Sequence, residues 1–109
     1  MNEPNSPIAK LSLLGRPPQG VPFAITLEVG TPYQVTSSRE EWACPLRFYP
    51  FLNKPKDIIG GDSLQALSMA LCLVGDLLQD FQDKGGTLQY DTGDSFSLEG
   101  YRLGNFKPS

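Results

Sequence analysis

The sequence predicts an α+β domain, in which an antiparallel sheet of four to six strands packs on one long helix at about residues 62–84. Residues 60–86 combine a capped start, an apolar repeat of helical period and a double-glycine end. The segments on either side alternate with a period of two, which is typical of half-buried strands. The 11 Gly and 10 Pro among 109 residues favour short elements joined by turns.

The helix has recognisable signals at both ends. Gly60 and Gly61 interrupt the chain, and the Asp62 carboxylate can accept a hydrogen bond from the amide of Leu64 or Gln65. The Gln65 side chain can reach back as a capping-box partner. Lys84 complements the helix dipole in the last turn, and 85–86, both glycine, end the helix. Capping explains the Gly-Gly-Asp-Ser start better than an anion site does, because Asp62 is itself negative.

The predicted helix is amphipathic, with an apolar stripe that we expect to face the sheet. A second apolar shoulder is either core beneath residues 50–59 or a surface for a partner. Three aspartates share part of the polar side and form either a solvated face or a docking patch for a basic partner. The stripe is Leu64, Leu67, Leu71, Val74, Leu78 and Phe81 with Ala70 and Leu77 beside it, the shoulder is Ala66, Met69 and Leu73, and the aspartates are Asp76, Asp80 and Asp83.

The strands are expected at 8–14, 21–29, 42–49, 87–90 and 95–98, joined mainly as sequential hairpins, with 57–59 either a strand or a bend. Pro45 lacks an amide hydrogen and therefore predicts an edge position or a bulge. Ala9 is expected to face inward. Residues 30–40 are read as a connection and 1–7 as a loose tail. The expected core is Phe23, Ile25, Leu27, Trp42, Leu46, Phe48, Leu67, Leu71, Val74, Leu78, Phe81 and Leu88, with Tyr101 and Phe106 lying across it.

Length and charge narrow the class of protein. A chain of 109 residues fits a single domain, residues 1–109. The net charge is −3 and the basic residues are scattered along the sequence, which argues against nucleic-acid binding. No wholly apolar run is long enough to span a membrane, and the N-terminus does not resemble a signal peptide. Cys44 and Cys72 are read as reduced thiols of a cytoplasmic protein.

Candidate catalytic and metal-binding groups are weak. The absence of histidine removes Ser-His and Cys-His nucleophile pairs and His-ligated zinc, and we expect no cofactor and no metal. Asp91 begins a D-T-G triplet like that of dimeric acid proteases, but its late position and the following Asp94 make a hairpin turn the better interpretation. The spacing of Asp91, Asp94 and Glu99 does not match a calcium loop.

Three segments resemble an uncharacterised family of small bacterial proteins, a conserved domain of unknown function. They are E-V-G-T-P-Y (28–33), E-W-A-C-P-L-R-F (41–48) and I-I-G-G-D-S-L-Q-A-L-S-M-A-L (58–71). The resemblance extends over about residues 23–90 and implies a bacterial, stand-alone domain without an assigned catalytic residue. By analogy, small acidic proteins of this kind often act as immunity proteins or accessory binding modules.

Three functional hypotheses follow. The leading one is a non-enzymatic protein-binding module, in its most concrete form an immunity or antitoxin-type inhibitor of a basic bacterial toxin. Its contacts would come from Asp76, Asp80, Asp83, Met69 and Leu73. The second is a small-molecule or peptide binder whose aromatic contacts, on the sheet and loops, are Tyr33, Trp42 and Tyr49. The third is a dimeric acid protease acting through Asp91. A homodimer is also open under the first hypothesis.

Overall fold

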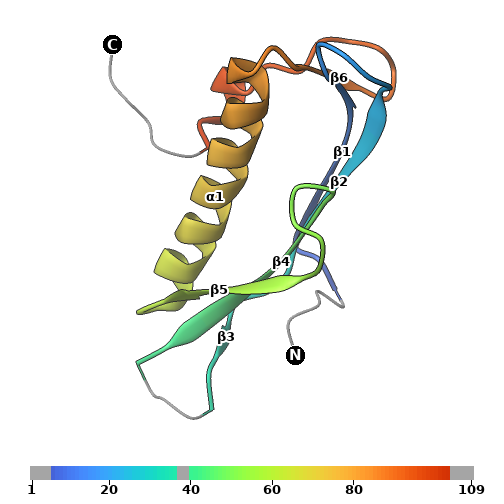
Figure 1. Ribbon diagram of the computed structural model, residues 1–109. Coiled ribbons are helices and arrows are strands. Elements are labelled where there is room, and N and C mark those ends of the chain that lie inside the picture. The colour runs from blue at the N-terminus through green and yellow to red at the C-terminus, as the bar shows by residue number, and fades with distance from the viewer. Residues whose placement is uncertain (1–5, 37–39, 104–109) are drawn as a thin grey trace.

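The computed structural model describes residues 6–36 and 40–103, so the predicted contact of Phe106 and most of the predicted N-terminal tail lie outside the described residues. The fold is α+β, as predicted, with six strands and one long helix (Figure 1). The elements are β1 (Ala9–Arg16), β2 (Phe23–Val29), β3 (Tyr33–Gln34), β4 (Trp42–Tyr49), β5 (Lys56–Gly60), α1 (Ser63–Asp83), β6 (Thr87–Tyr90) and the 3₁₀ turn η1 (Glu99–Tyr101).

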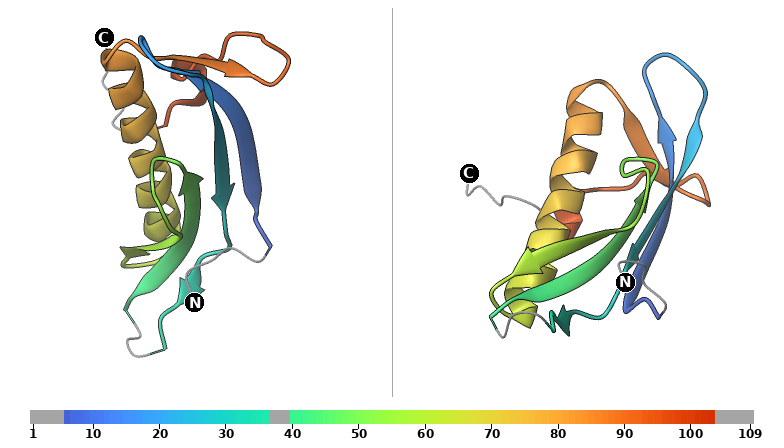
Figure 2. Two further views of the ribbon diagram at one scale, coloured as in Figure 1. Left: turned by 45° about the vertical axis from the view of Figure 1, so that its right-hand side comes forward. Right: turned by 60° about the horizontal axis from the view of Figure 1, so that its bottom comes forward.

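All strand pairs of the sheet are antiparallel, in the order β3-β4-β2-β1-β6, with β5 on the other side of β4. The predicted strands 8–14 and 21–29 pair as β1 and β2, and the predicted strands 21–29 and 42–49 pair as β2 and β4. Strands β3 and β5 both pair with β4, and β6 pairs with β1. Helix α1 covers one face of the curved sheet, and no helix of the described residues covers the other face (Figure 2).

Of the two alternatives that the sequence predicts for Pro45, the edge strand is wrong. Pro45 lies within β4, which pairs with β5 along one side and with β2 and β3 along the other. The ladder is irregular beside Pro45, since the three residues 30–32 lie opposite the two residues 44–45 between the β2–β4 and β3–β4 pairings. The main-chain groups of Pro45 face the gap between β2 and β3, where its carbonyl accepts a hydrogen bond from Gly30 N at 2.8 Å. A proline fits an interior strand here because its missing amide falls where no partner strand pairs.

The start of α1 is capped as the sequence predicts. Asp62 Oδ1 accepts from Gln65 N at 2.7 Å, and Gln65 Oε1 accepts from Gly61 N at 2.6 Å. The reciprocal bond therefore reaches the residue before the cap, one position earlier than in a standard capping box. Lys84 follows the last helical residue and its ammonium lies 2.9 Å from Asp80 Oδ2.

The face that α1 turns to the sheet differs from the predicted stripe. Ala66, Ala70, Val74 and Leu78 are fully buried, one helical turn apart, whereas Leu64 is 73% exposed. The predicted Leu67, Leu71 and Phe81 are partly buried at the margins. The helix is thus rotated toward its small residues, because alanines let its backbone approach the sheet more closely than leucines would.

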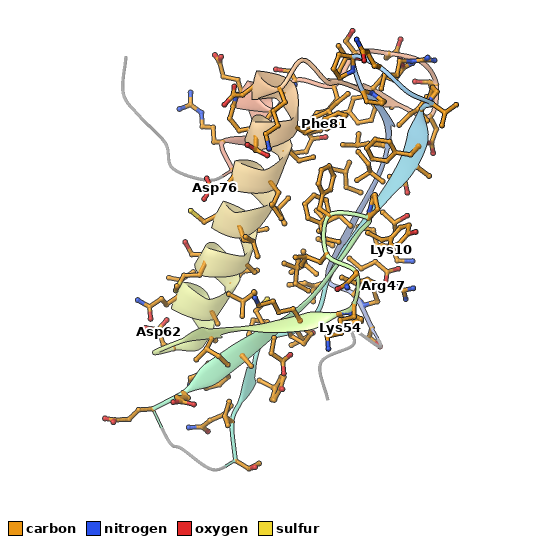
Figure 3. The ribbon with its side chains drawn as sticks, in the orientation of Figure 1. Lys10, Arg47, Lys54, Asp62, Asp76 and Phe81 are labelled. Atoms are coloured by element: carbon orange, nitrogen blue, oxygen red, sulfur yellow. The ribbon has the colours of Figure 1, made fainter. Side chains whose placement is uncertain are left out.

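The inner faces of the strands complete the core. Phe23 and Trp42 are only partly buried. The buried members of the cluster on the strands and the C-terminal segment are Leu13, Ile25, Leu27, Val29, Cys44, Leu46, Phe48, Ile58, Leu88, Phe96 and Leu98. Near the C-terminal end of α1, Phe81 packs edge-to-face on Phe23 and Phe51, with ring centroids 5.5 and 5.9 Å apart. Figure 3 shows Phe81 directed from the helix toward the sheet.

Ala9 lies on the inner face as expected, opposite the buried Val29, but it is exposed because the ladder of β1 with β2 ends there. Two further expectations are corrected. Residues 95–98 form a single bridge, Gln89 with Ser95, in place of a strand, since the chain turns into η1 once Phe96 and Leu98 are buried. Tyr33–Gln34 form a short strand within the predicted connection 30–40.

Among the described residues, α1 is long and apolar enough to cross a bilayer, with a mean hydropathy of 1.3 over its most apolar window. Length and composition alone do not separate a membrane span from a core helix. In this fold its most buried residues contact the sheet.

Candidate interaction surface

One edge of α1 combines apolar and acidic side chains, and we call it the open helix edge. At about 100° per residue, its five members lie within about 80° of one another around the helix. The three aspartates are exposed, Met69 is 48% exposed and Leu73 is partly buried against the core. Figure 3 shows Asp76 directed away from the sheet. The open helix edge consists of Met69, Leu73, Asp76, Asp80 and Asp83.

The carboxylates of this edge have few neighbours to neutralise them. Asp83 Oδ1 accepts from Gln79 Nε2 at 2.9 Å, and Lys84 is the cation that contacts Asp80. Both contacts are exposed and separated by four residues, so each contributes only about 0.3–0.5 kcal/mol. The edge therefore presents negative charge to solvent beside an accessible methionine.

The apolar shoulder is part core and part surface. Ala66 is fully buried and Leu73 packs against the core, whereas Met69 projects to solvent. The sequence left open whether this shoulder is core or a surface for a partner. In the structure, Ala66 and Leu73 belong to the core and Met69 belongs to the surface. Helical spacing could not separate them, because it gives the angle of a residue but not the position of the sheet.

The opposite edge of α1 faces the segment that follows β6. Leu67, Leu71 and Leu103 are partly buried, and a hollow of about 290 Å³ lies between the helix and residues 101–103. The segment is held at Tyr101, whose hydroxyl lies 2.5 Å from that of Tyr90. This hydrogen bond is the main reason that the pKa of Tyr90 is raised above its usual value.

The three aromatic residues of the ligand-binding hypothesis do not converge. Trp42 lies on the inner face of β4 and packs against the core, whereas Tyr49 lies seven positions later and therefore on the outer face, where it is 58% exposed. Tyr33 is on the outer face, paired with Ala43. A hollow of about 340 Å³ lies along residues 52–57, and none of the three aromatics lines it.

Tyr33 has a specific structural partner on that outer face. Its hydroxyl donates to Asp57 Oδ2 at 2.6 Å, so the side chain bridges from β3 across β4 to β5. Asp57 Oδ1 is buried without a hydrogen-bond partner among the described residues. The bond to Asp57, with smaller contributions from burial and from the Asp57 charge, raises the pKa of Tyr33 to about 12. Sequence reasoning missed this pair, because 24 residues separate its members and no local pattern connects them.

The remaining chemical candidates are dispersed. Cys44 is buried, which with the nearby charge of Asp57 raises the pKa of its thiol, and Cys72 lies on the helix. Asp91 is exposed in the turn after β6, where Gly93 has a φ of +95° and Tyr90 N donates to Asp94 O. Within the described ranges, no group of three His, Cys, Asp or Glu side chains is arranged to hold a metal ion.

Comparisons of the chain with protein-family models, with curated proteins and with solved structures found no match.

Proposed function

We propose that this protein is a non-enzymatic protein-binding module that recognises a basic partner through the open helix edge. The observation that supports the proposal is the combination of an accessible methionine with three exposed carboxylates on one side of α1. A flexible apolar side chain supplies contact area on a variable partner, while surrounding charge steers association and selects a partner of opposite sign.

The most concrete form is an immunity or antitoxin-type inhibitor of a basic bacterial toxin, acting in the cytoplasm. The net charge of −3 favours encounter with a cationic protein. In this mechanism the rigid helix would block the toxin's cationic site, and binding alone would suffice for inhibition. The edge needs no rearrangement for this role, because α1 is already anchored to the sheet by its buried face.

The decisive experiment pairs the chain with the product of the neighbouring gene. We expect direct binding in calorimetry and rescue of cells that express that product. The triple variant Asp76→Asn, Asp80→Asn, Asp83→Asn should weaken binding by about tenfold or more and reduce its salt dependence. Met69→Ala should weaken it without changing the salt dependence.

A matched control removes three acidic charges elsewhere, by Asp91→Asn, Asp94→Asn and Glu99→Gln, and should leave affinity within about twofold. Equal loss in both triple variants would mean that only net charge matters and would reject the helix edge. Absence of both binding and protection would reject the inhibitor role.

A further inference from the structure

We infer that β5 is the contact strand of a symmetric dimer, in which the β5 strands of two copies of this chain pair antiparallel and join their sheets. The inference goes beyond the proposed function and uses an edge of the sheet, not the open helix edge. It starts from a difference between the two ends of the sheet. At the β6 end, the segment after the turn closes the edge, since Phe96 N donates to Leu88 O at 3.1 Å and Tyr90 N to Asp94 O at 2.8 Å.

At the other end, β5 pairs with β4 alone among the described residues. Asp57 lies opposite Pro45, whose carbonyl is engaged with Gly30 on the far side of β4. Asp57 and Pro45 are therefore a pair without mutual hydrogen bonds, so the main-chain N–H and C=O of Asp57 point away from β4. Because main-chain groups alternate in direction along a strand, the N–H and C=O of Ile59 also point away from β4. The edge thus presents two donors and two acceptors to another strand.

Beyond Lys56 at its start, the side chains of this edge do not protect it as edge strands usually are protected. Charged side chains commonly discourage pairing at such positions. The Asp57 carboxylate, however, is bound across the outer face by Tyr33. Beside it Ile59 is 45% exposed and Tyr33 36% exposed, so a pairing strand would also cover apolar surface.

A second copy is the occupant that the charges favour. Lys54 and Lys56 precede and begin β5, whereas Asp62 follows its end. An antiparallel copy places the basic start of each strand beside the acidic end of the other, twice by symmetry. A parallel copy would bring like charges together instead.

The expected register centres on Ile58, so that Asp57 of each copy lies opposite Ile59 of the other. These are the two residues whose main-chain groups point outward, and the register leaves Gly61 N in its bond to Gln65. Four main-chain hydrogen bonds would then join the copies.

The test measures mass by sedimentation velocity from about 1 to 200 µM, together with amide exchange in the same samples. We expect a monomer–dimer equilibrium, with the amides of Asp57 and Ile59 protected more strongly as concentration rises. Ile59→Asp should weaken the dimer at least about tenfold, because the register sets each new carboxylate opposite Asp57 of the other copy. Val21→Asp, at a position 81% exposed between β1 and β2, is the control and should dimerise like the wild type.

A charge substitution before the strand gives a second test. Lys54→Glu should weaken the dimer, because the register places Lys54 of each copy opposite Asp62 of the other. A monomer throughout the range, or a dimer in which both amides exchange independently of concentration, overturns the inference. Protection of these amides only by an added extended peptide also overturns it. The triple aspartate variant of α1 should still dimerise, which separates this result from the proposed function.

Discussion

The two ends of the helix–sheet interface are built from residues of opposite size. At the N-terminal end of α1, Ala66 and Ala70 are fully buried, and a Cβ on Gly60 would lie 2.4 Å from the Ala66 backbone nitrogen. At the C-terminal end, Leu78 and Phe81 fill the space with Phe51 and its aromatic neighbours. The ribbons accordingly touch near β5 and separate toward β1 and β2 (Figure 1).

This difference shows how one helix serves as a wedge on a curved sheet. Small residues set the distance where helix and strand meet, and large residues maintain the density of packing where the two diverge. We call the N-terminal end of this interface the narrow end and the C-terminal end the wide end. Adding atoms to a side chain should destabilise the narrow end, and removing atoms from a side chain should destabilise the wide end. The two ends can be perturbed separately.

The largest effect is expected at the wide end, from Leu78→Ala. Leu78 is fully buried, so its truncation leaves a cavity and should lower the free energy of unfolding by about 3–4 kcal/mol. Leu64→Ala is the control, since Leu64 belongs to the same predicted stripe but is 73% exposed, and should cost less than about 0.5 kcal/mol. Urea denaturation of both variants measures the difference, and equal losses would contradict the observed rotation of α1.

The next effect is expected at the narrow end, from Gly60→Ala. The added methyl group meets the helix backbone, which cannot rotate away as a side chain can, and should lower the free energy of unfolding by about 2–3 kcal/mol. Native-state thiol labelling provides a local measurement, because Cys44 lies opposite Ile58 in the adjoining ladder and should react faster in the variant. Gly61→Ala meets only the Gln65 side-chain oxygen, at 3.2 Å, and should change both readings little. Unchanged stability in Gly60→Ala would show that the interface can open at no cost.

The smallest effect on stability is expected from Tyr33→Phe, on the outer face of the sheet, where Tyr33 bonds to Asp57 of β5. Loss of one partly exposed hydrogen bond should lower the free energy of unfolding by about 0.5–1 kcal/mol at neutral pH. The pKa of Tyr33 is raised from 10.0 in the unfolded reference to about 12, so its contribution is fully present below pH 10. That contribution is lost as the pH rises toward 12, because the unfolded state releases the proton first.

Denaturation of the wild type and of Tyr33→Phe between pH 8 and 12 checks this pH dependence. The stability difference between them should shrink as the pH rises above 10. Tyr49→Phe is the control, since Tyr49 is 58% exposed on the same face. A difference that stays constant to pH 12 would mean that the bond to Asp57 does not control the ionisation of Tyr33.

Of the candidate interaction surface, spacing along the helix was enough to place Asp76, Asp80 and Asp83 on one side of α1. It could not show that Met69 beside them is exposed while Leu73 is partly covered, since that depends on where the sheet lies. The three aromatic residues of the ligand-binding hypothesis do not meet in one place. The alternation of the predicted strand 42–49 already puts Trp42 and Tyr49 on opposite faces, and the structure agrees.

The sequence by itself determined the parts of the fold whose causes are local. Helix α1 spans Ser63–Asp83, within one residue of the predicted 62–84 at each end, because Asp62, Gln65 and Gly85 act on their immediate neighbours. Tertiary structure decided which helical face is buried, since apolar residues occupy more of the helix than one sheet can cover. The close approach of Gly60 to Ala66 selects the small residues and leaves Leu64 in solvent. Tertiary structure also decided that Pro45 lies inside the sheet. Only the pairing of β4 shows that the position of the missing amide falls between β2 and β3, where no residue of either strand pairs with Pro45.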